Sequence, residues 1–139
     1  MFDRCLYFNV NALARVVNRK WTESFAVFDL SPAHAYLLRI VLSRPGITSK
    51  ELSAELQLEK STISRFVDVL QKKKLLIRKK SMGGDAREQN IYPTSKAIKM
   101  HAALDELGEN LYQAMLSEIG EKQLAVLVKQ LRSSANKIK

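Results

Sequence analysis

The stretch that decides the fold is Leu58–Thr94, LEKSTISRFVDVLQKKKLLIRKKSMGGDAREQNIYPT. Its first part, from residue 60 to about residue 73, has the apolar spacing of an amphipathic helix. The apolar face comprises Ile63, Phe66, Val67 and Leu70. Residues 75–78 and 89–92 then read as two short strands, and Gly83-Gly84 between them can adopt the positive φ that a turn requires. The pattern therefore predicts a helix followed by a β-hairpin.

The face of this helix opposite the apolar stripe is polar and basic. It carries Ser61, Thr62, Arg65, Asp68 and Lys72. Between residues 60 and 87, nine Lys and Arg stand against two Asp, a net charge of +7 out of the +9 of the whole chain. Clustered cations gain free energy on a polyanion because they release its condensed counterions. The concentration of charge predicts a nucleic-acid partner rather than an ordinary solvated face.

The residues before this stretch predict two further helices. Ser31 can cap a helix that has Pro32 at its first position and ends near Pro45-Gly46. Thr48 and Glu51 have the spacing of a capping box, which would begin the short helix SKELSAELQ. The second of these helices is short and is joined by a tight turn at Leu58-Glu59 to the helix that begins near Lys60. Two short helices joined in this way, the second with a polar outer face, indicate a helix-turn-helix. With the hairpin behind it, the expected fold is mainly α with a small β-hairpin wing.

Long apolar helices are expected on both sides of this region, over residues 3–28, 95–119 and 121–137. The first has its apolar stripe at Leu6, Val10, Leu13, Val17 and Trp21. A long apolar helix at a chain terminus needs a partner surface, and a second copy of the chain is the expected partner. We expect a single domain, 1–139, with a DNA-binding lobe at 31–94 and a helical dimerisation region at 1–30 and 95–139.

Other function classes lack support in the sequence. It has no phosphate-binding glycine motif, no metal-spaced cluster and no nucleophile motif, so neither an enzyme nor a cofactor is expected. No window approaches twenty apolar residues, so no membrane association is expected. The N-terminus does not read as an export signal, and the single Cys5 cannot form an internal disulfide. These features favour a cytoplasmic protein.

The chain resembles the MarR family of bacterial transcriptional regulators in three motifs. Ser61–Leu70 matches the family's small polar residues followed by a two-turn apolar stripe. Asp85-Ala86-Arg87 matches its Asp-x-Arg wing signature after a basic strand. Pro93–Ala97 stands where the family has Leu-Thr-x-x-Gly. The order of the expected helices and strands extends the resemblance over essentially the whole chain.

The resemblance implies a homodimeric regulator, expected to be a repressor, that binds a pseudo-palindromic operator in double-stranded DNA. The residues it assigns to base edges and phosphates of the major groove are Ser61, Thr62, Ser64 and Arg65. Arg87 would enter the minor groove, and Asp85 would support the wing by pairing with Arg65 or Arg78. The residues it assigns to the DNA backbone are Lys72, Lys79 and Lys80, which would position the protein without reading sequence.

Two positions depart from the family pattern. Lys74 stands where the family usually has Gly between the recognition helix and the wing, and Ala97 replaces the Gly after the wing. A left-handed conformation at Lys74 would cost roughly 1–2 kcal/mol relative to Gly, unless the helix ends differently. Neither departure removes an expected contact residue.

Several alternatives stay open. Cys5 is either an incidental thiol or the sensor of a redox-responsive regulator of this family. His34 and His101 lie on different predicted helices and are interpreted as ordinary histidines rather than metal ligands. The aromatic residues Trp21, Phe25, Phe28 and Tyr36 either pack in the core or line a pocket for a small aromatic effector, whose binding would release DNA. A winged helix that binds protein instead of DNA would need neither the wing arginine nor the cations beside the recognition helix.

Overall fold

A computed structural model of the chain describes residues 1–80 and 88–139. The chain divides into two compact units, Met1–Asp105 and Glu106–Lys139. The boundary falls within one helix, α5 (Ser95–Ile119). The expected fold class is confirmed: the protein is mainly helical, with a small antiparallel sheet.

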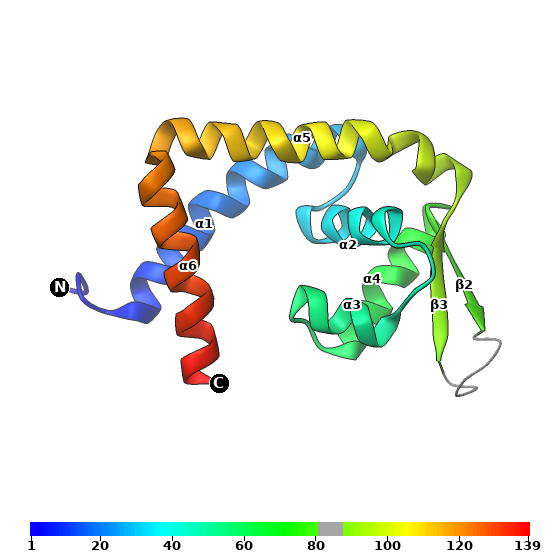
Figure 1. Cartoon of the computed structure of the whole chain (residues 1–139), viewed down its shortest axis with the longest axis horizontal. Coiled ribbons are helices and arrows are strands. Elements are labelled where there is room, and N and C mark those ends of the chain that lie inside the picture. The colour runs from blue at the N-terminus through cyan, green and yellow to red at the C-terminus, as the bar shows by residue number, and fades with distance from the viewer. Residues whose placement is uncertain (81–87) are drawn as a thin grey trace. The chain divides into compact units, whose positions relative to one another are not determined.

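The first unit contains the predicted helix-turn-helix (Figure 1). Its two helices are α3 (Ser49–Leu56) and α4 (Lys60–Lys72), and α2 (Pro32–Ser43) precedes them. Ser31 caps α2, its hydroxyl accepting a bond from the amide of His34 at 3.2 Å. The capping box of α3 is also present, with the amide of Glu51 donating to Thr48 Oγ1 at 3.1 Å. Both helix starts are therefore where the sequence predicts them.

The sheet has three antiparallel strands in the order β1–β3–β2. Strands β2 (Leu76–Lys80) and β3 (Gln89–Pro93) form the wing hairpin, with Arg78 opposite Ile91. The added strand, β1 (Ile47–Thr48), pairs Ile47 with Ile91 from the other side. The sequence prediction did not include β1, which ties the start of α3 to the wing.

The core of the first unit lies between α2, α3, α4 and the sheet. Fully buried side chains there include Leu38, Val41, Leu52, Ile63, Val67, Leu70, Leu76 and Ile91. Of the predicted α4 stripe, Phe66 alone is only half-buried, and its ring packs edge-on against His34 at 4.6 Å between centroids. This packing fixes the apolar face of α4 inward, so its polar face points to solvent.

The end of α4 has the geometry of a Schellman motif. Lys74 adopts the left-handed conformation, with φ of 62°. Its amide donates to the Gln71 carbonyl at 2.9 Å, and the amide of Leu75 donates to the Leu70 carbonyl at 2.9 Å. Leu70 and Leu75 are both buried, as is usual for the apolar contact of this motif. The strained lysine that the sequence suggested is therefore present.

The first helix is shorter than predicted. Helix α1 spans Leu6–Phe25, and Ala26–Phe28 continue as a 3-10 turn, η1. Asp29 then takes a left-handed conformation, with φ of 55°, and redirects the chain into α2. The expectation of one helix over residues 3–28 was wrong at both ends, because it followed apolar spacing alone.

The remaining helices match their predicted ranges. Thr94 caps α5 through a bond from the amide of Ala97 to its hydroxyl at 3.3 Å. Gly120, with φ of 100°, separates α5 from α6 (Glu121–Ile138). Within residues 1–80 and 88–139, no single helix is long and apolar enough to cross a membrane. The segments Leu6–Phe28 and Pro32–Ser43 are bent by 61° relative to each other, and only together do they have the length and apolar composition of a membrane span.

Candidate nucleic-acid interface

The outer face of α4 presents the predicted reading residues. Ser61, Ser64 and Arg65 are exposed, and Thr62 is half-buried. Arg65 Nη2 donates to Thr62 Oγ1 at 3.3 Å, so the two side chains lie together on one turn of the helix. Hydroxyl groups and a guanidinium on one helical face are donors and acceptors suited to base edges and phosphates.

Arg78 connects the wing strand β2 to α4, and we call this set of contacts the Arg78 clamp. Its Nη1 donates to Asp68 Oδ1 at 2.8 Å and to Gln71 Oε1 at 2.7 Å. Its Nη2 donates to the Ser64 carbonyl at 3.0 Å and lies 3.5 Å from Ser64 Oγ. The three partners follow i, i+4, i+7 spacing, so one stripe of α4 faces the wing.

The lysines at this surface project away from the core. Lys72, Lys79 and Lys80 are all exposed. Lys79 Nζ lies 4.9 Å from the centroid of the Tyr92 ring on β3, which holds its stem along the hairpin. The lysines at the end of α4 and on β2 therefore extend the positive surface from the recognition helix into the wing.

Asp85 and Arg87 lie outside the described residues, so the contacts predicted for them are not observed. The predicted partners of Asp85 do have neighbours elsewhere: Arg78 in the clamp and Arg65 beside Thr62. Sequence reasoning did not identify Asp68 as a partner of Arg78. Helical spacing placed Asp68 on the polar face of α4 but could not show which strand would approach it.

Two of the four aromatic residues proposed for an effector site line a pocket of about 320 Å³. Trp21 Nε1 donates to the Tyr36 hydroxyl at 3.0 Å on one wall of it. Phe25 is instead fully buried in the core, between Phe28 and Tyr36. The complete lining is Val17, Asn18, Trp21, Pro32, Ala33, Tyr36, Leu56 and Leu58. The last two flank the turn of the helix-turn-helix, so the pocket lies between α1, α2 and that turn.

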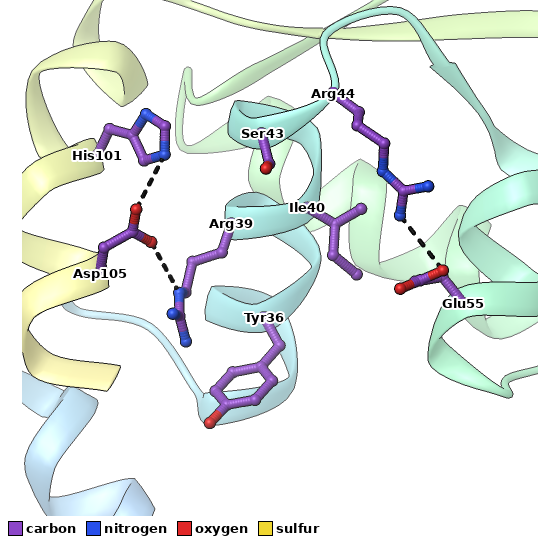
Figure 2. Close-up of a pocket in the computed structure, with 8 residues that line it drawn as sticks. All are labelled: Tyr36, Arg39, Ile40, Ser43, Arg44, Glu55, His101 and Asp105. Carbon is purple, nitrogen blue, oxygen red and sulfur yellow. Dashed lines mark hydrogen bonds and ion pairs between the residues drawn. The ribbon is translucent and has the colours of Figure 1, made fainter. Parts of the chain in front are cut away.

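Tyr36 also lines a second pocket, of about 280 Å³ (Figure 2). Its charged groups are paired: Arg39 Nε lies 3.2 Å from Asp105 Oδ1, and Arg44 Nη2 lies 3.3 Å from Glu55 Oε2. His101 Nε2 reaches the other oxygen of Asp105 at 3.2 Å. With each cation matched by a carboxylate, this pocket has no excess charge to attract an ionic ligand.

The two histidines have separate surroundings. His101 contacts Asp105, and His34 Nδ1 lies 2.8 Å from the Ser31 hydroxyl. Burial, and secondarily the positive charge of Lys73, lowers the pKa of His34 from its ordinary value of 6.5. In the described ranges no group of three or more His, Cys, Asp or Glu could hold a metal ion.

Residues 28–88 match the model of the MarR family. A comparison with curated proteins found no match.

Solved structures with the same fold include a MarR protein from Peptoclostridium difficile. It is 22% identical, has a TM-score of 0.83, and covers 98% of this chain and 88% of its own. The DNA complex of S. aureus MepR is 20% identical, with a TM-score of 0.84 over 95% of this chain and 96% of that one. The PcaV transcriptional regulator from Streptomyces coelicolor, in complex with its natural ligand, is 18% identical, with a TM-score of 0.82. It covers 100% of this chain and 97% of its own.

At these identities the solved structures establish the fold, while the family match concerns the sequence itself. Among the described residues, the matched segment contains α2, β1, α3, α4 and β2. The family match and the shared fold confirm the resemblance found in the sequence: residues 28–88 match the MarR family model, and the described elements in this range have the fold of solved MarR-family regulators.

Proposed function

We propose that the protein is a sequence-specific regulator of transcription that binds double-stranded DNA as a homodimer. The observation that carries the proposal is the exposed polar face of α4, with Ser61, Ser64 and Arg65, beside the basic strand β2. A helix of this kind fits the major groove, and the hairpin would follow the backbone towards the minor groove. MepR, which has the same fold, is solved in complex with DNA.

The dimer is proposed from apolar surface on the terminal helices. Exposed side chains on α1 include Leu6 (59%), Tyr7 (79%) and Val16 (63%), and α6 exposes Val126, Val128 and Leu131. Apolar surface of this extent marks an interaction site, and a second copy would bury it symmetrically. The lobe formed by residues 31–94 would then be presented twice, at a spacing fixed by residues 1–30 and 95–139.

The reading role is tested by selecting duplexes from a random-sequence pool and measuring their affinities by fluorescence anisotropy. If Arg65 reads a base, Arg65→Ala should cost roughly 1–3 kcal/mol on the selected duplex and relax the preference at one position. Equal weakening on every duplex would make Arg65 a phosphate contact. A pool that yields no enriched sequence with the wild-type protein would overturn sequence-specific binding.

We also propose that a small effector occupies the pocket lined by Trp21 and Tyr36, and that its binding reduces the affinity for DNA, as in a repressor released by its ligand. The volume of about 320 Å³ is at the small end of known ligand sites. Among the described residues, its lining combines two aromatic rings with apolar side chains and the amide of Asn18, and none of these side chains is charged. These features favour a neutral aromatic compound over a carboxylate, which would lose its hydration without gaining a cation.

The effector proposal can be tested through Trp21, the single tryptophan of the chain. Titration with single-ring aromatic amides, each matched by its carboxylate, should change Trp21 emission saturably with the amides only. Ala33→Phe would fill the pocket and should abolish the response, while Ala54→Phe, on the exposed side of α3, should preserve it. A response that survives Ala33→Phe, or a stronger response to the carboxylates, would contradict the proposal.

A further inference from the structure

We infer that the Arg78 clamp sets the position of the wing relative to the recognition helix, and that Asp68 thereby supports DNA binding although it carries a negative charge. The inference rests on the proposed function, because it assigns a positioning role within the same DNA-binding surface. Neither Arg78 nor Asp68 needs to touch DNA for this role.

The geometry of the clamp is specific to arginine. One guanidinium contacts three residues of α4 at once, with both terminal nitrogens engaged. A lysine ammonium on a flexible stem cannot reproduce this planar fork. The Arg78 side chain is only 19% exposed, so its charge is partly removed from water and depends on the Asp68 carboxylate as a partner.

The location of the clamp explains why it would matter for binding. Helix α4 is fixed to the core by Ile63, Val67 and Leu70, on the face that points inward. Among the described residues, Arg78 adds contacts from a side stripe of the same helix to the strand that begins the wing. Two DNA-contacting elements must be held within a fraction of an ångström to bind adjacent grooves together. Loss of the clamp would leave each element folded but free to shift against the other.

Electrostatics alone predicts that removing the charge of Asp68 increases the affinity for DNA, whereas the clamp inference predicts a decrease. The direction of the change therefore tests the inference. Asp68 is 55% exposed on the helix proposed to enter the groove, where a carboxylate repels phosphates. Removing its charge should therefore strengthen binding if the residue has no structural task. Under the clamp inference, Asp68→Asn weakens binding to the selected duplex several-fold. Glu59→Gln is the matched control, because it removes an exposed negative charge just before α4 without touching the clamp.

The experiment compares the wild-type protein with Asp68→Asn, Arg78→Lys, the double variant and Glu59→Gln. Affinities are measured for the selected duplex and for a scrambled duplex of equal length. We expect the single clamp variants to lose affinity for the selected duplex, to keep their affinity for the scrambled one, and to show no further loss when combined. Glu59→Gln should bind both duplexes at least as tightly as the wild type. A gain in affinity with Asp68→Asn, or additive losses in the double variant, would overturn the inference.

A measurement on the free protein separates this inference from the proposed function. Asp68→Asn should accelerate amide hydrogen exchange in Leu76–Lys80 of the full chain, while exchange at the buried α4 residues Ile63 and Val67 stays unchanged. Unchanged exchange in that strand would overturn the clamp whether or not the protein binds DNA. Faster exchange in a protein that binds no duplex would support the clamp and refute the proposed function.

Discussion

The amide of Leu75 donates a hydrogen bond to the carbonyl oxygen of Leu70 across 2.9 Å, and this bond closes helix α4 through Lys74, a residue in a left-handed conformation. The carbonyl of Lys74 also accepts a bond from the Thr94 hydroxyl at 2.7 Å. The left-handed conformation of Lys74 is therefore fixed by one hydrogen bond to α4, before the wing, and by one from Thr94, after it.

Lys74→Gly should stabilise the protein by about 1 kcal/mol, because glycine adopts positive φ without a steric penalty. Part of the relief is offset by the greater entropy of glycine in the unfolded chain. Chemical denaturation monitored by circular dichroism would measure the change. Lys74→Ala is the control for the lost charge and should give no gain. Equal stabilisation by Ala and Gly would show that charge repulsion, not backbone strain, is relieved.

Ile63→Ala should lower the free energy of unfolding by about 3 kcal/mol, since it empties a fully buried position between α4 and the rest of the core. The matched substitution is Ile77→Ala on β2, where the side chain is 39% exposed. It should cost under about 1 kcal/mol. Urea unfolding of both variants makes the comparison, and similar losses would contradict the assignment of the inward face of α4.

The lowered pKa of His34 predicts a specific dependence of stability on pH. Burial disfavours the charged ring in the folded state, so the unfolded chain binds the proton more readily. The contribution of neutral His34 is complete above its ordinary pKa of 6.5 and decreases as the pH falls from there towards the folded pKa. The difference in unfolding free energy between wild type and His34→Gln should therefore be constant above pH 6.5. Below pH 6.5 the wild type should lose stability relative to the variant. A difference that does not vary with pH would contradict the cause assigned here.

Thr48→Ala should destabilise the protein by about 1 kcal/mol, because it removes the capping acceptor for the amide of Glu51. The Thr48 hydroxyl also donates to the Glu51 carboxylate at 2.9 Å, so Thr48→Ser should retain most of the stability. Thermal unfolding of the two variants checks this order. Equal losses would mean that the methyl group, not the hydroxyl, supports the start of α3.

Local signals in the sequence were sufficient for most of the fold. Ser31-Pro32, the Thr48–Glu51 spacing and Gly120 mark helix boundaries that the structure confirms, because capping and left-handed conformations depend on neighbouring residues alone. The position of Lys74 as a strained helix end was also recognisable, from the glycine that the family carries there.

Features that depend on distant residues could not be predicted in this way. Strand β1 has only two residues and exists because Ile47 pairs with Ile91, 44 positions away. Leu37, Leu38 and Val41 of α2 are all fully buried, because that helix is covered on several sides, which spacing along the chain does not show. The partnership of Arg78 with Asp68 likewise requires the hairpin to fold back onto α4. Spacing along the chain identifies a polar face but not the element that will cover it.

We propose that the basic surface of α4 and β2 binds duplex DNA through the DNA phosphates. The most direct measurement is the affinity of the wild-type protein and of Lys79→Gln/Lys80→Gln for the selected duplex over a range of salt concentrations. The logarithm of the association constant should fall linearly with the logarithm of the salt concentration, by about 0.9 per phosphate contacted. If both lysines contact phosphates, the double variant should reduce this slope by about 1.8. A wild-type affinity that is nearly independent of salt would contradict the account.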